Sequence, residues 1–150
     1  MDDDALALFA LLNRAQDGLR SRFDDFRQAL ERRDAPAYRL GLADFQQALE
    51  AWTAAEQRAL LPALERAAIP GRDARREVSL EFVQLRELTR QLRAGIEGGA
   101  RMADVLGLAE NLARRFDAHE RGMRDVYHPA AAPRLDDGER KILEEAARSL

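Results

Sequence analysis

The sequence contains no cysteine and only two histidines in 150 residues. The lack of cysteine excludes disulfides, thiolate metal sites, iron–sulfur clusters and cysteine nucleophiles. No apolar run approaches the roughly 20 residues with which a helix crosses a bilayer. The acidic start MDDDALALFALL also lacks the basic segment of a secretory signal. We therefore expect a cytoplasmic protein that does not enter a membrane.

The chain also lacks a charge excess of either sign. Its 24 basic and 27 acidic side chains leave a formal net charge of −3, with both signs interspersed. Clustered Lys and Arg normally mark a surface for nucleic acid or an anionic membrane, so the sequence supports neither partner. The richness in Ala, Arg and Leu suggests a GC-rich bacterial genome.

Val, Ile and Thr are scarce, and no stretch alternates in the manner of a strand. Strong helix formers dominate instead, which predicts an all-α fold. Pro129 and the tract AAAPRLDD are expected to end the last long helix. Caps and breaks predict four long helices and a short one, at about 4–33, 36–67, 73–96, 101–128 and 137–149.

Long helices joined by short loops predict an up-down-up-down antiparallel four-helix bundle. We assign residues 1–130 to this bundle, and residues 131–150 to a linker and a C-terminal helix that packs on the bundle or on a partner. The start of the first helix, ALALFALL, has more apolar residues than one buried face needs. Either the C-terminal helix or a second subunit should cover it, and the second case would make a homodimer.

Two stretches of this predicted bundle follow one template. WTAAEQRALLP begins at Trp52 and HERGMRDVYHP begins at His119, and each ends in proline after ten further residues. Their first and fifth positions, which in the first stretch are Trp52 and Glu56, lie on the apolar stripe of the second and fourth helices. In an antiparallel bundle these helices run in the same direction, so the stretches predict a pseudo-twofold site between them.

These stretches resemble the metal-binding motifs of the hemerythrin-like, or HHE cation-binding, four-helix bundles. That family has His-x-x-x-Glu followed by apolar residues and a proline on its second and fourth helices. LEFVQLRELTRQL is similar to the family's third-helix stretch, with Phe82 where a histidine would stand, and the spacing places the first-helix histidine near Gln16. The resemblance covers roughly residues 5–130. It implies a non-haem di-iron site held by histidines and carboxylates from all four helices.

The chain departs from that pattern at most of the ligand positions. Such iron sites use imidazole and carboxylate ligands, which Trp and Phe do not supply, and the Met123 thioether is too soft for ferric iron. The large side chains should fill the volume of the lost metals. These site-filling residues are Trp52, Phe82, Phe116 and Met123, whereas only Glu56 and His119 remain at ligand-type positions and Gln16 is a weaker candidate.

An unpaired buried carboxylate is costly, so Glu56 should have a partner. The resemblance implies a geometry in which both positions face one centre. We therefore expect Glu56 and His119 to approach within hydrogen-bonding distance, directly or through one water, with Gln16 nearby. A buried polar cluster that fixes the register of the helices is favoured over a working site. His128, beside Pro129 at a helix end, is expected to be exposed, and no catalytic constellation is evident.

The leading hypothesis is a non-catalytic relic of the hemerythrin-like family, without cofactor, that acts as a structural, sensing or protein-interaction module. Its partner would be a second copy or an unknown protein. The alternative is a metal-binding protein with a reduced, mononuclear site for iron or another cation, held by Glu56, His119 and Gln16. A third option is a small-molecule pocket between the helices, lined by the aromatic replacements.

Overall fold

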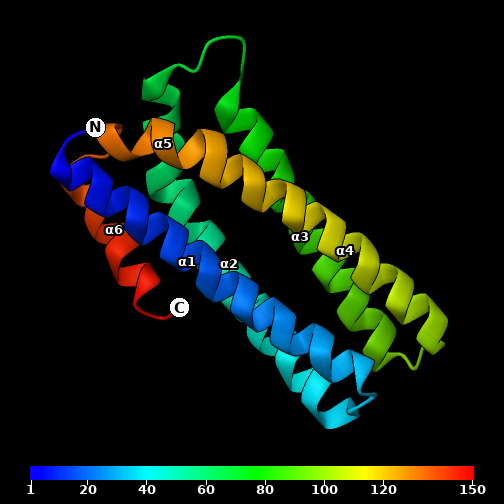
Figure 1. Cartoon of the computed structure of the whole chain (residues 1–150). Coiled ribbons are helices and arrows are strands. Elements are labelled where there is room, and N and C mark those ends of the chain that lie inside the picture. The colour runs from blue at the N-terminus through cyan, green and yellow to red at the C-terminus, as the bar shows by residue number, and fades with distance from the viewer.

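A computed structural model describes all 150 residues, from Met1 to Leu150. It is built from helices without a strand, which confirms the predicted all-α class (Figure 1). No helix is both long enough and apolar enough to pass through a membrane. The helices are α1 (Asp3–Glu31), α2 (Ala35–Ala67), α3 (Ala74–Glu97), α4 (Met102–Gly122), α5 (His128–Ala131) and α6 (Asp137–Ala147).

Aspartate residues begin most of these helices. Asp2, Asp34, Asp73 and Asp136 each accept a hydrogen bond from the backbone N–H three residues later. Such caps satisfy amide groups that have no partner within the helix. The caps explain why the sequence located the helix starts to within a few residues.

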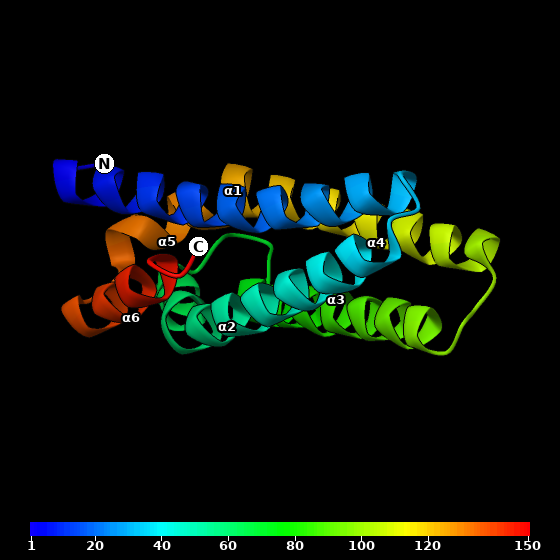
Figure 2. The same cartoon turned by 90° about the horizontal axis from the view of Figure 1, so that it is seen from below.

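Each long helix packs against the one before it in the chain, α2 on α1, α3 on α2 and α4 on α3. Figures 1 and 2 show these helices lying roughly lengthwise beside one another. The backbones of α1 and α4 approach less closely, and bulky side chains bridge them. Phe116 of α4 lies 5.4 Å from Phe23 of α1 and 5.6 Å from Phe45 of α2, measured between ring centroids.

The end of α4 differs from the sequence prediction, because Pro129 does not stop the helix. The chain passes through a π-helical turn, Met123–Tyr127, into α5 and then a 3-10 turn, Ala132–Arg134. The backbone N–H of His128 donates to the carbonyl of Met123, five residues earlier. Proline is tolerated in the first turn of a helical segment, where its missing N–H is not needed. Pro129 holds that position in α5.

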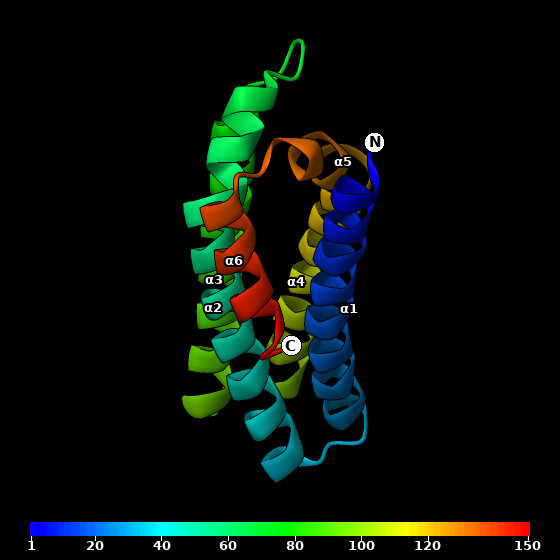
Figure 3. The ribbon, with the colours of Figure 1, turned by 90° about the vertical axis from the view of Figure 1, so that its left-hand side faces the viewer.

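The C-terminal helix α6 packs against α2 and also contacts α1 (Figure 3). Arg66 of α2 pairs with Glu139 of α6, and Arg22 of α1 donates to the carbonyl oxygens of Ser149 and Leu150. At the apolar start of α1, Leu8 is buried while Leu6 stays half exposed.

Candidate functional site

The four residues predicted to fill a lost metal site are all buried. Phe82 on α3 lies beside His119, with 5.7 Å between the ring centroids. Phe116 belongs instead to the aromatic group with Phe23 and Phe45, one turn before His119 in α4. Trp52 and Met123 have almost no exposed surface. Buried side chains therefore occupy all four of these positions.

Glu56 is fully buried on α2, and neither of its carboxyl oxygens has a hydrogen-bond partner in the chain. Burial raises the pKa of the Glu56 carboxyl well above its ordinary value, and the charge of Glu81 raises this pKa further. Burial acts in this direction because it penalises the charged form. The site therefore favours the neutral acid, which can donate a proton in a hydrogen bond but is a poor metal ligand.

His119 does not hydrogen-bond to Glu56, so the predicted direct contact between them is wrong. Its Nδ1 lies 2.8 Å from Oε1 of Glu81, on α3. The Glu81 side chain is about one-third exposed, so its charged form keeps part of its hydration. Pairing with Glu81 thus avoids the desolvation that an ion pair with the fully buried Glu56 would require.

His128 is fully buried, which corrects the prediction that it is exposed. Each residue of an α-helix turns by about 100°, so residues nine apart, such as 119 and 128, would lie on opposite faces. The π-helical turn takes one extra residue and thereby rotates His128 by about a quarter turn, back towards α1. Its Nδ1 there lies 2.9 Å from Oδ1 of Asn13.

The environment of His128 keeps its imidazole neutral. Burial lowers the pKa of His128 to about 3, and the charges of His119 and Arg124 contribute to the decrease. With Asn13 Oδ1 as the acceptor, Nδ1 carries the proton and Nε2 is left as an acceptor. Nε2 is buried and has no hydrogen-bond partner in the chain.

Gln16 adds a further buried polar group on α1. Its side chain is fully buried, and neither its amide nitrogen nor its amide oxygen has a partner in the chain. The indole N–H of Trp52 is in the same situation. Unpaired buried groups are rare in native proteins because each costs free energy. The core thus holds several polar groups, on α1, α2 and α5, that the chain itself does not pair.

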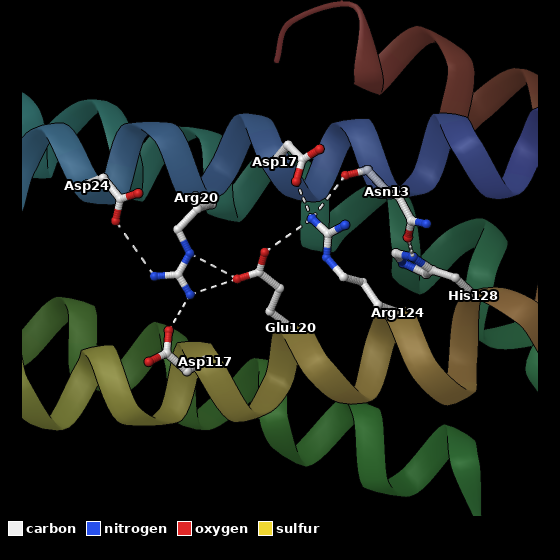
Figure 4. Close-up of polar contacts among 8 residues, drawn as sticks. All are labelled: Asn13, Asp17, Arg20, Asp24, Asp117, Glu120, Arg124 and His128. Atoms are coloured by element: carbon white, nitrogen blue, oxygen red, sulfur yellow. Dashed lines mark hydrogen bonds and ion pairs between the residues drawn. The ribbon is translucent and has the colours of Figure 1, made fainter.

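A chain of ion pairs joins α1 to α4 next to these residues (Figure 4). Arg20 of α1 pairs with Asp117 and, at 2.7 Å, with Glu120 of α4. Arg124 reaches back to Asp17 and also pairs with Glu120 at 3.2 Å. Since the two backbones are not in close contact, these long side chains bridge α1 and α4 alongside the contact of Phe23 with Phe116.

A surface cleft of about 330 Å³ between α3 and α4 leads to His119 and Glu81. Tyr127 also lines it and donates a hydrogen bond to Glu77 at 2.8 Å. The pKa of Tyr127 is raised to about 12, chiefly by burial and then by this hydrogen bond. Trp52 and Phe82 do not line this cleft, so it is not the aromatic-lined pocket of the third sequence hypothesis.

The donor set does not fit a di-iron centre. No three His, Asp or Glu side chains are grouped so that they could hold a metal ion. Glu56 favours its neutral form, and the Nδ1 atoms of both histidines are engaged by Glu81 and Asn13. Comparison with protein-family models, curated proteins and solved structures found no match. The resemblance to hemerythrin-like bundles therefore rests on motif spacing alone.

Two residues of the site, Glu81 and Asn13, were not predicted from the sequence. Glu81 directly precedes the buried Phe82. Its position could have indicated a role, because a residue next to the buried face of a helix borders the neighbouring helix. Asn13 gave no signal of its own, since its role depends on the rotation of His128 by the π-helical turn.

Proposed function

We propose that the chain is a hemerythrin-like, up-down-up-down bundle that has lost its di-iron site and serves as a non-catalytic structural, sensing or protein-interaction module in the cytoplasm. The arrangement of the long helices and the template shared by residues 52–62 and 119–129 support this fold. The buried Trp52, Phe82 and Met123 support the loss of the metals, because they stand where the family has ligands.

The observation that carries this proposal is the complete burial of Glu56 without a hydrogen-bond partner in the chain. A carboxyl group must lose its proton to bind a metal ion, so metal binding and a raised pKa oppose each other. Glu56 is the one carboxyl retained from the motif pair, and its surroundings favour the neutral acid. In this position it serves as a buried polar group of the core.

One observation favours the alternative of a mononuclear metal site. Glu81 holds Nδ1 of His119 in the way that carboxylates orient metal-ligating histidines, and Glu56 and Gln16 present buried atoms without partners in the chain. A cation that bound there would have to displace the proton from Glu56. The two functions therefore differ in the charge of this one carboxyl group.

Metal analysis of the purified protein, followed by melting curves with ferrous, manganous or zinc ions, separates these functions. The proposal predicts a colourless protein without stoichiometric metal and a melting temperature that the ions leave unchanged. Stoichiometric iron with an oxo-to-iron charge-transfer band would overturn it. A melting temperature that rises with metal concentration, and that no longer does so in Glu56→Gln, would establish the mononuclear alternative.

A further inference from the structure

The outer face of α3 carries two apolar side chains that nothing in the chain covers. Leu80 and Val83 each expose 52% of their surface. They point away from the buried stripe of the same helix, which includes Val78, Phe82 and Leu85. They are three positions apart along the helix, so they form one small patch.

This patch is the centre of a longer stripe with alternating steps of three and four residues. That spacing keeps a stripe on one face of a helix and is the pattern of a seam between two packed helices. Charged residues flank the apolar centre on both sides. In chain order, the stripe is Asp73, the N-cap residue of α3, followed by Arg76, Leu80, Val83, Glu87 and Arg90 within the helix.

We propose that α3 forms a homodimer interface with α3 of a second copy, antiparallel and related by a twofold axis between positions 81 and 82. This symmetry sets Leu80 against Val83 of the second copy. It also sets Arg76 against Glu87 and Asp73 against Arg90, each pair occurring twice. In every facing pair, the two side chains are then either both apolar or opposite in charge, as a self-complementary interface requires.

The charge order favours this orientation over a parallel one. In a parallel pair, each residue would face its own copy, so Arg76 would meet Arg76 and Glu87 would meet Glu87. Like charges at such short separation weaken association. Within the chain Glu87 already pairs with Arg90, and the antiparallel dimer would extend this pair into a network that includes Arg76.

The seam covers 18 residues and hence about 26 Å of helix. Such a contact is at the small end of protein interfaces, so we expect a dissociation constant on the order of tens of micromolar. This interface involves only the outer face of α3 and does not depend on what the core binds.

Sedimentation equilibrium over a concentration series tests the interface. The wild type should approach twice the 16.9 kDa chain mass as its concentration rises. Leu80→Glu should weaken association by at least about tenfold, because it places a carboxylate in the apolar centre. Leu40→Glu is the matched control, since Leu40 is also an exposed leucine, at 73%, but lies on α2; it should leave association unchanged. A wild type that stays monomeric at millimolar concentration, or equal effects of the two variants, would overturn the proposal.

A charge swap tests the orientation. Arg76→Glu and Glu87→Arg should each weaken association several-fold, whereas the double variant should restore it to within about twofold, because the pairs re-form with reversed signs. Absence of rescue would contradict the antiparallel pairing. The chain has no cysteine, so a mixture of Leu80→Cys and Val83→Cys should form disulfides between the two variants in preference to either with itself. Equal cross-linking within and between the variants would also refute this register.

Discussion

The buried carboxyl of Glu56 should make the protein less stable as the pH rises. The pKa of this group in the folded state lies well above the value of 4.5 expected in the unfolded chain. The folded state therefore binds the proton more tightly. The resulting contribution to the unfolding free energy is fully present below pH 4.5 and is lost as the pH increases to the folded-state pKa.

The isosteric variant Glu56→Gln isolates this effect, because it keeps the shape and removes the titration. Between pH 4.5 and the folded-state pKa, the wild type should lose about 1.4 kcal/mol of unfolding free energy per pH unit relative to the variant. Glu56→Leu should be more stable than Glu56→Gln by about 1–3 kcal/mol, since it leaves no unpaired polar group in the core.

Urea unfolding of the wild type and Glu56→Gln from about pH 5 to about pH 8 measures this difference. Other titrating groups are common to both proteins and cancel. A difference that does not change with pH would refute the assignment of Glu56 as a neutral buried acid. A wild type that instead gains stability relative to the variant as the pH rises would indicate that a cation pairs with Glu56 in the folded state.

His128 should make the protein less stable as the pH falls, because its pKa drops from 6.5 to about 3 on folding. Its contribution to the unfolding free energy is complete above pH 6.5 and declines by about 1.4 kcal/mol per pH unit below that value. His128→Gln should remove this slope in the same unfolding assay. Arg20→Ala should cost about 1 kcal/mol in low salt and less in high salt, whereas Arg101→Ala, with a side chain 87% exposed, should cost almost nothing; equal losses would contradict the role of the α1–α4 ion pairs. Trp52→Ala should lower the unfolding free energy by about 3–5 kcal/mol, because the large buried indole is part of the hydrophobic core. A loss below about 1 kcal/mol would show that the indole is not packed. Tyr127→Phe should abolish the component of an ultraviolet titration that ionises near pH 12, and a component that persists would have another origin.

The fold class and the helix starts were predictable because they depend on local chemistry. Asp34 and Asp73 cap helices that begin within one residue of the predicted starts, and apolar residues repeat with the helical period. The same period identified Trp52, Phe82 and Met123 as residues that face the interior. These features need only the spacing along one helix, so the sequence alone contains them.

The polar contacts were not predictable, because they depend on how helices are rotated against one another. The π-helical turn changes which face His128 presents, and no residue type in Met123–Tyr127 marks it. The pairing of His119 with Glu81 rather than with Glu56 depends on which carboxylate retains contact with water. A prediction based on α-helical spacing therefore located the candidate residues and missed their partners.

The protonation of Glu56 in the presence of iron tests the central claim most directly. An infrared difference spectrum of wild type minus Glu56→Gln near neutral pH isolates the vibrations of this one carboxyl group. We predict the C=O band of a neutral carboxylic acid, unchanged when ferrous iron is added. A carboxylate band in its place, present from the start or formed on adding iron, would show that Glu56 is ionised and contradict the loss of the metal site.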